Sequence, residues 1–397
     1  MKKDWEINKL GDVCEIARGG SPRPIKDYIT TDEDGINWIK IGDTDPSGKY
    51  IYTTSEKIKP AGLKKSRYVE AGDFLLSNSM SFGRPYVLQT NGCIHDGWLV
   101  LKNYQKSLYL DFFYYLLLSP NVQKQFEIEA KGSTVRNLNT EIVSNINVSY
   151  PPLEEQKRIV KILDEKFAQL ETIKTNAQTN LQNAKDLFQS QLAKAFSNTT
   201  WEKKRLQDCT SIIGDGLHGT PKYDENGNYY FINGSNLTIT DIVFTPETKR
   251  VNETEYQKYK VELNENTVFL SINGSTLGKR TAFYNNEPVI LGKSACYINV
   301  KSNTLNKYFL RHFLSSDIFQ EYAWKEKTGA AIPNLGLKAM RDLKIPLPPL
   351  PEQKRIVKEL DTLSEKVRQL QEIYTKQIAN CDELKQALLQ KAFEGDL

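Results

Sequence analysis

The chain repeats its own sequence at an offset of about half its length. A 14-residue segment that begins at Pro151 returns at Pro348, and 12 of the 14 positions are identical. Lys194–Phe196 returns as Lys391–Phe393 at the same offset of 197 residues. A period this long indicates domain duplication, because solenoid and propeller repeats are much shorter. The 397-residue chain is therefore expected to hold two copies of one module, each a globular part followed by a long helix.

The helical segments carry the pattern of a coiled coil. In the second, apolar residues recur every seven positions at Leu360, Val367, Tyr374, Cys381 and Leu388, and other apolar residues follow three positions later. Both segments open with Pro-Pro and acidic residues, which suit a first helical turn. About 45 residues at 1.5 Å each give a helix of roughly 65–70 Å, which needs a partner. We expect the two helices to pair with each other; the alternative is packing on another subunit.

The globular parts contain both strand-like and helix-like runs. Gly35–Ile41, Asp73–Ser77, Tyr229–Ile232 and Thr267–Ser271 have strand character. Helical runs are expected at 109–118, 121–130, 305–314 and 317–327. We therefore predict an α+β fold with two mixed α/β domains separated by two long helices, which form an antiparallel coiled coil with a pseudo-twofold internal duplication. The predicted parts are domain 1 (1–150), helix 1 (151–198), domain 2 (199–347) and helix 2 (348–397).

Composition excludes several classes of protein. No run of 18 apolar residues is present to span a membrane, and five scattered cysteines suggest reduced thiols in a cytoplasmic protein. The three histidines do not stand near a cysteine at metal-binding spacing. The net charge of +4 is spread evenly, so binding to nucleic acid would require a local basic face.

Known catalytic motifs are missing from the sequence. The segment Gly274–Arg280 is one residue short of a phosphate-binding loop and ends in Arg. There is no G-x-S-x-G or H-E-x-x-H motif, and no Asn/Asp-Pro-Pro-aromatic tetrapeptide of the kind that marks amino-methyltransferases. We therefore expect no catalysis, no metal and no cofactor in this chain.

Two pairs of polar loops occupy equivalent places in the copies. Small polar side chains and terminal cations can contact base edges or phosphates, although the same residue types also form ordinary turns. The loop 77–84 corresponds to 271–280, and 131–138 corresponds to 327–335. The candidate DNA-binding residues are Ser77, Asn78, Ser79, Ser81, Arg84, Arg136, Asn137, Ser271, Asn273, Ser275, Lys279, Arg280 and Asn334.

The repeated Pro-Pro-Leu-x-Glu-Gln-Lys-Arg-Ile-Val helix opening, with a diverged globular part before each copy, resembles the DNA-specificity subunit of type I restriction–modification enzymes. The resemblance covers the whole chain. It implies two target recognition domains that each bind one half of a split DNA site, with the helices as a spacer. It also implies that the helix openings contact partner subunits, through Glu155, Gln156, Arg158, Glu352, Gln353 and Arg355.

The same resemblance implies what the partners are. Two modification subunits would bind S-adenosylmethionine and methylate adenine, and restriction subunits would supply ATP-dependent translocation and cleavage. The alternative is a free-standing coiled-coil scaffold or DNA-binding protein without methylase partners, and a third possibility is an enzyme in its own right. The sequence does not give the target bases, the spacer length, the base-contacting loops, the stoichiometry or the presence of a restriction subunit.

Overall fold

The computed structural model describes residues 4–78, 82–104, 106–131, 137–198 and 200–397. The chain divides into two compact units, each containing one globular domain and half of each long helix. Unit 1 comprises residues 1–177 and 376–397, and unit 2 comprises residues 178–375. The long helices are α5 (Leu153–Phe196) and α10 (Leu350–Glu394).

Among the described residues of unit 1, the strands form three sheets. β1 (Glu6–Lys9) pairs antiparallel with β12 (Asn147–Tyr150). A five-stranded sheet has the order β3 (Ile29–Thr30), β6 (Glu56–Ile58), β4 (Ile36–Ile39), β10 (Gly92–Ile94) and β7 (Arg67–Val69). Another has the order β2 (Glu15–Arg18), β11 (Trp98–Lys102), β8 (Phe74–Ser77), β9 (Pro85–Leu88) and β5 (Tyr50–Ile51). The helices are α1 (Leu10–Val13), α2 (Leu110–Leu118), α3 (Pro120–Lys131) and α4 (Thr140–Ser144), with 3-10 turns η1 (Ile25–Asp27), η2 (Ile41–Asp43) and η3 (Pro60–Lys65).

Unit 2 repeats this plan with smaller sheets. β13 (Lys203–Arg205) pairs with β21 (Lys344–Pro346). One sheet has the order β14 (Thr210–Asp215), β20 (Ala295–Val300), β17 (Thr267–Ser271) and β18 (Thr281–Phe283), and another β16 (Arg250–Val251), β15 (Tyr229–Ile232) and β19 (Val289–Leu291). The helices are α6 (Glu253–Tyr259), α7 (Lys307–Leu314), α8 (Asp317–Glu326) and α9 (Leu337–Asp342), with 3-10 turns η4 (Leu206–Cys209), η5 (Gly234–Asn236) and η6 (Gly274–Thr276).

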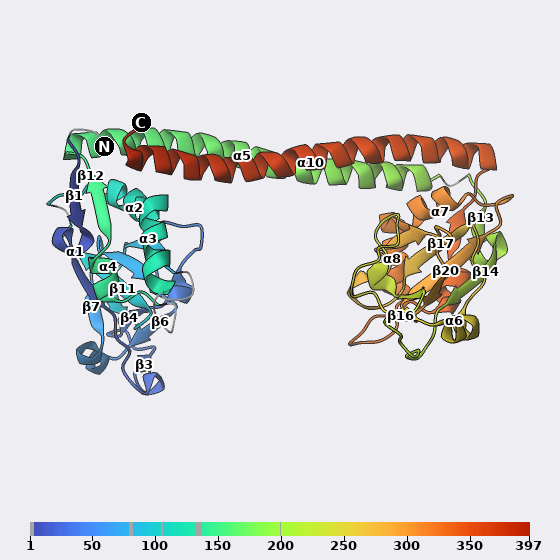
Figure 1. The fold of residues 1–397 in the computed structure, drawn as a ribbon, viewed down its shortest axis with the longest axis horizontal. Helices are drawn as coiled ribbons and strands as arrows, with labels where there is room; N and C mark the ends of the chain where they lie inside the picture. The colour runs from blue at the N-terminus through green and yellow to red at the C-terminus, as the bar shows by residue number, and fades with distance from the viewer. Residues whose placement is uncertain (1–3, 79–81, 105, 132–136, 199) are drawn as a thin grey trace. The chain divides into compact units, whose positions relative to one another are not determined.

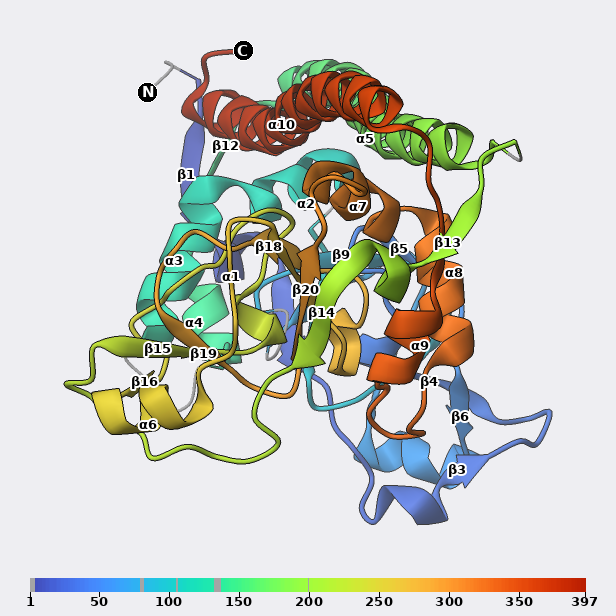
Figure 2. The same cartoon turned by 90° about the vertical axis from the view of Figure 1, so that its right-hand side faces the viewer.

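The long helices pair antiparallel within each unit (Figure 1, Figure 2). In unit 1, Arg158 Nη2 donates to Leu397 O at 2.7 Å and Lys174 Nζ donates to Asp382 Oδ1 at 2.6 Å. Residue numbers therefore increase along α5 as they decrease along α10, which makes the pair antiparallel. In unit 2, one apolar core holds residues from both helices, including Leu192 and Ile356. The predicted fold class, with two mixed domains and a coiled coil, is confirmed.

Each globular domain is fastened to its helix by a buried glutamine. Gln156 is fully buried: its Oε1 accepts from Tyr109 N at 2.8 Å, and its Nε2 donates to Ser107 O and Pro151 O, both at 2.8 Å. The amide therefore joins the start of α5 to the loop before α2. Because all of these groups lie inside the protein, leaving them without partners is costly.

Gln353 forms the same connection in unit 2. Its Oε1 accepts from Asn306 N at 2.8 Å, and its Nε2 donates to Thr304 O at 3.0 Å and Pro348 O at 2.8 Å. Gln353 is also fully buried. Both glutamines therefore have a structural role within this chain, and their predicted contact with a partner subunit stays a prediction.

A second helix–domain contact uses one aspartate and different partners. Asp164 of α5 accepts from Tyr115 Oη at 2.5 Å. Its equivalent, Asp361 of α10, accepts from Arg311 Nη2 at 2.8 Å and lies 2.8 Å from His312 Nε2. Burial is the main cause that lowers the pKa of His312 to about 4, so this imidazole is neutral at pH 7.

Replacing Gln156 by Ala should lower the stability of unit 1 by about 1–3 kcal/mol, because buried backbone groups lose their hydrogen bonds. Urea unfolding monitored by circular dichroism measures this change. Gln353→Ala should act equally on unit 2. Gln182→Ala, an exposed position on α5, is the matched control and should leave the unfolding midpoint unchanged; equal midpoints for Gln156→Ala and this control would contradict the structural role.

Candidate nucleic-acid interface

The first pair of predicted loops is built on two equivalent serines. Ser77 ends β8 and Ser271 ends β17, and both are fully buried. Arg84 N donates to Ser77 Oγ at 3.0 Å, and Arg280 N donates to Ser271 Oγ at 3.3 Å. These serines thus close the loops from inside. Their burial gives both serines a structural role, and their predicted contact with bases stays a prediction.

Asn78 is also an internal support. Its side chain is 1% exposed, and its Nδ2 donates to Asp96 O at 2.8 Å. This burial argues against a direct base contact for Asn78 as well. The predicted residues Ser79, Ser81 and Arg136 lie outside the described residues.

The two loop arginines are half-buried and bind backbone oxygens. Arg84 Nη2 donates to Gly48 O at 3.4 Å, and its guanidinium lies 5.5 Å from the centre of the Tyr86 ring. Arg280 Nη1 donates to Ser235 O at 2.8 Å. Each arginine therefore stiffens its loop, while the neighbouring Ser275 and Lys279 are exposed.

The structure brings the two predicted loops of each unit together. In unit 2, Asn273 Nδ2 donates to Asn334 Oδ1 at 3.3 Å, and Leu335 N donates to Ile272 O at 2.8 Å. In unit 1, Leu138 N donates to Asn78 O at 3.0 Å, which places the half-buried Asn137 beside the first loop. In unit 2 the two loops thus form one surface, and in unit 1 the described ends of the loops, at Asn78 and Leu138, lie together.

Of the charged residues at the helix openings, Arg158 and Arg355 are exposed and Glu155 and Glu352 are half-buried, whereas the glutamines between them are fully buried. Arg158 forms a two-point contact with Glu155, with both nitrogen–oxygen distances 2.7 Å. Arg355 makes the same contact with Glu352, at 2.8 and 2.7 Å. Such partly solvated pairs add little stability, and the predicted contact of these residues with a partner subunit stays a prediction.

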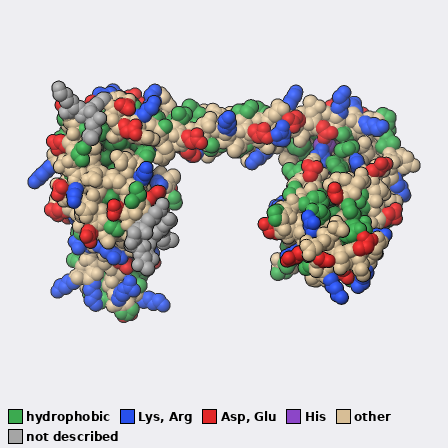
Figure 3. Space-filling view, viewed as in Figure 1, with side chains coloured by type: hydrophobic (Ala, Val, Ile, Leu, Met, Phe, Trp, Pro, Cys, Tyr) green, Lys and Arg blue, Asp and Glu red, His purple; other side chains and the backbone are tan. Residues whose placement is uncertain are grey.

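A basic segment that the sequence reasoning missed lies at one end of unit 1. Residues 57–67 hold five basic and no acidic side chains: Lys57, Lys59, Lys64, Lys65 and Arg67. All but Lys57 are exposed. Lys and Arg side chains gather at the end of unit 1 where β3 and β6 lie (Figure 3). The net charge of the whole domain is close to zero and gives no sign of this basic segment, whereas a charge count over about ten residues at a time does.

Two further glutamines were also missed. Gln123 Nε2 donates to Gly83 O at 2.9 Å and Leu117 O at 2.6 Å. Gln320, 197 residues later, donates to Gly278 O at 2.6 Å and Leu314 O at 3.2 Å. Each joins a predicted loop to the helix pair behind it. Their identity at the repeat offset was the available signal.

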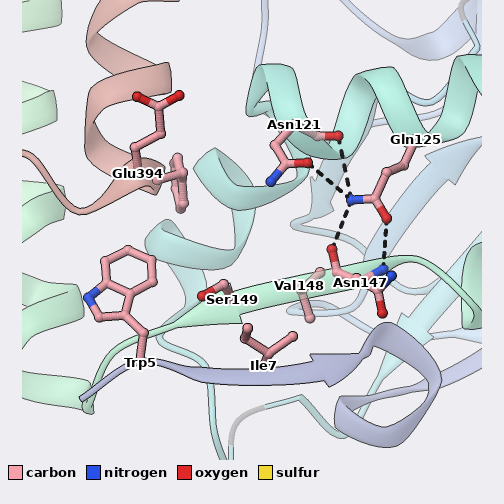
Figure 4. A pocket seen from close by; sticks show the side chains of 9 residues that line it. Trp5, Ile7, Asn121, Gln125, Asn147, Val148, Ser149 and Glu394 are labelled. Carbon is pink, nitrogen blue, oxygen red and sulfur yellow. Dashed lines mark hydrogen bonds between the residues drawn. The ribbon is translucent and has the colours of Figure 1, made fainter. Parts of the chain in front are cut away.

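A cavity of about 540 Å³ separates the end of α10 from the β1–β12 pair. Figure 4 shows Trp5 and Ile7 on the strand side and Glu394 on the helix. At its edge, Gln125 Nε2 donates to Asn147 O and Asn147 N donates to Gln125 Oε1, both at 2.9 Å. These polar groups satisfy one another, so we assign this region to the attachment of the helix.

The part of the chain that the structure describes has neither a candidate metal site nor a candidate membrane-spanning helix. Within it, no three His, Cys, Asp or Glu side chains cluster in a way that could hold a metal ion. The described helices include none that is both long and apolar enough to cross a bilayer.

Comparison with known proteins identifies the class. The family model for the type I restriction modification DNA specificity domain matches residues 2–181 and again residues 198–378. The chain belongs to this family, and the double match repeats the internal duplication. Its role is that of a DNA-specificity subunit, which is not a catalytic one.

Individual relatives agree over most of the chain. It is 25% identical to the type I restriction enzyme MjaVIII specificity subunit of Methanocaldococcus jannaschii, covering 91% of this chain and 87% of the relative. It is 26% identical to the StySPI specificity subunit of Salmonella potsdam, covering 100% and 90%. None of these relatives supports a free-standing scaffold.

Solved structures share the fold. A chain from a study of complex assembly and conformational transition of the type I R-M system matches with a TM-score of 0.81 at 22% identity, covering 100% of this chain and 99% of that one. The HsdS subunit from Thermoanaerobacter tengcongensis matches with a TM-score of 0.62 at 21% identity, covering 100% and 98%.

Replacing Lys59, Lys64 and Lys65 together by Gln should weaken DNA binding and flatten its salt dependence. Each lost phosphate contact lowers the slope of log K against log salt by about 0.9. Fluorescence anisotropy of the assembled complex at several salt concentrations measures both quantities. Lys106→Gln, Lys124→Gln and Lys194→Gln combined remove equal charge elsewhere and serve as the control; matching slopes for the two triple variants would show that the basic segment does not touch DNA.

Proposed function

We propose that this chain gives a type I restriction–modification enzyme its specificity by recognising a two-part, asymmetric DNA site. Each globular domain would contact one half of the site, through the surface formed by its paired loops. The exposed predicted residues Ser275 and Lys279, with the half-buried Asn137, Asn273, Asn334, Arg84 and Arg280, remain the candidates for this contact.

One observation carries the proposal: the two copies keep their attachment to the helices and change their exposed loops. Gln156 and Gln353 make equivalent hydrogen bonds, as do Gln123 and Gln320. The loops between these supports differ in length and residue type. A constant frame with two different surfaces suits recognition of two different half-sites.

The partners in this proposal are two modification subunits that methylate adenine, with restriction subunits in the larger complex. S-adenosylmethionine and ATP would bind those partners, and this chain would bind neither. A methylase must turn its target base out of the helix, so a separate subunit that fixes its position on DNA is useful. The complex would act in the cytoplasm.

Exposed apolar residues on the long helices favour the binding of two copies of one partner subunit. Ile173 and Leu370 stand 197 residues apart, as do Leu187 and Leu384. Their exposures are 41%, 38%, 46% and 52%. Unit 1 carries Ile173 and Leu384, and unit 2 carries Leu370 and Leu187. Each unit therefore presents apolar side chains at the same two repeat positions, to which an identical subunit can bind.

Replacing Leu187 and Leu384 by Ser should reduce assembly with the modification subunit about tenfold or more, since exposed apolar area is what a partner would bury. Size-exclusion chromatography of mixtures measures the assembled fraction. Ile128→Ser on α3, where the side chain is 56% exposed, is the matched control. Normal assembly of the double variant would place the docking surface elsewhere.

Exchange of residues 201–330 for the matching region of a relative should change one half of the recognised sequence and keep the other. The reason is that each domain is a compact unit with its own core. Sequencing native DNA for methylated adenine, with and without this gene, gives the starting site. A change in both halves, or in neither, would refute independent recognition.

A further inference from the structure

Both globular domains hold a loop at the same backbone anchor. Gly19 follows β2 and Gly216 follows β14, at the repeat offset of 197. A Cβ added to Gly19 would lie 2.1 Å from His95 O, and one added to Gly216 would lie 2.1 Å from Leu291 O. Glycine is required at both sites because the backbone at the end of a neighbouring strand passes so close.

The residue after each glycine bonds to the same strand. Gly20 N donates to Ile94 O, the end of β10, at 3.1 Å. Leu217 N donates to Leu291 O, the end of β19, at 2.7 Å. The loops that follow therefore begin in the same place in the two domains.

A second anchored turn stands beside this loop. β4 and β10 are parallel neighbours, as are β15 and β19, so their carboxyl ends meet at one edge. Lys40 follows β4 and its N donates to Asp43 Oδ2 at 2.8 Å. Asn233 follows β15 and its N donates to Asn236 Oδ1 at 3.0 Å. The two turns have the same hydrogen bond but different first residues.

In unit 1 these elements enclose a cleft of about 1060 Å³. Its lining combines apolar surface from Trp38 with the polar groups of Ser21, Arg23, Lys40 and Asp96. Ser21 Oγ donates to Asp96 Oδ1 at 2.5 Å, and Lys40 Nζ lies 2.8 Å from Glu56 Oε1. The cleft therefore carries charged side chains, and these two contacts hold Asp96 and Lys40 in place.

Four positions on this common frame carry different chemistry in the two domains. Arg18 ends β2 where Asp215 ends β14, and Ser21 corresponds to His218 at the repeat offset. Asp96 and Lys293 each stand two residues before equivalent strands, β11 and β20. The fourth pair is Lys40 and Asn233. Two of the four pairs reverse their charge.

The side chains in unit 2 are also poised at the surface. His218 Nε2 lies 2.7 Å from Asp215 Oδ2. Asn233 Oδ1 accepts from Ser294 Oγ at 3.1 Å, which leaves its amide nitrogen outside this contact. Lys293 and His218 are exposed. The same positions thus offer different donors and acceptors in the two domains.

Base edges are distinguished by such groups: Arg and Lys favour guanine, Asn favours adenine, and a carboxylate accepts from the cytosine amino group. Side chains that differ at equivalent positions of the backbone are what selection of different bases requires. We propose that the paired positions 18/215, 21/218, 40/233 and 96/293 determine which bases each domain selects in its half-site. This inference rests on the proposed function and assigns its specificity to these residues.

The test exchanges chemistry between the domains in the assembled methyltransferase complex. One variant carries Arg18→Asp and Asp96→Lys, and a second carries Lys40→Asn. Mapping of methylated adenines should show the half-site of domain 1 altered, with at least about tenfold less methylation of the original sequence, and the other half-site retained. Lys124→Asn, an exposed lysine on α3, is the control and should change nothing.

The reciprocal variants keep the test decisive if the first ones fold poorly. Asn233→Lys, and Asp215→Arg with Lys293→Asp, should alter only the half-site of domain 2. Unchanged half-sites at wild-type methylation in both domains would overturn the inference while leaving the proposed function intact. Absence of any two-part methylated site in the wild-type complex would instead refute the proposed function itself.

Discussion

The hydrogen bonds of Gln156 and Gln353 are the contacts on which the arrangement of each unit depends. A buried side-chain amide can satisfy one backbone N–H and two backbone carbonyls at once, and each glutamine does so. Apolar packing alone would allow a domain to slide along its helix, since it is non-directional. Directional hydrogen bonds at the first turn fix where the domain begins.

The duplication separates what must stay constant from what can change. Glutamines at the helix openings, glutamines behind the loops and glycines beside the strand ends keep their positions at the repeat offset. Side chains that point away from these supports have diverged in size and charge. A mutation at the surface therefore changes the exposed side chains at little cost to folding, because the backbone beneath them is held by other residues.

Much of the fold followed from the sequence, because helical period and repetition are properties of sequence. The helices predicted at 151–198 and 348–397 are observed at Leu153–Phe196 and Leu350–Glu394. The division into domains stays a prediction, since the compact units each take half of both helices. The strands predicted around Phe74 and Thr267 were also found.

The candidate site was harder to predict, because residue type does not tell which way a side chain points. Ser77, Asn78 and Ser271 are suitable for contacting bases, yet all three face inward and support their loops. Gln156 lies in a charged, helix-opening motif but is buried within it. Contacts between segments far apart, such as Asn273 with Asn334, are set by sheet topology, which no local pattern contains.

The aspartates at positions 164 and 361 suggest how such proteins can evolve by recombination. One accepts a hydrogen bond from a phenol and the other from a guanidinium, with an imidazole alongside. A carboxylate has several acceptor sites and tolerates donors of many shapes. The aspartate of the helix can therefore accept a hydrogen bond from different donor side chains of the attached domain. A gene segment encoding a foreign domain can be joined to an unaltered helix, and its own donor can complete the junction.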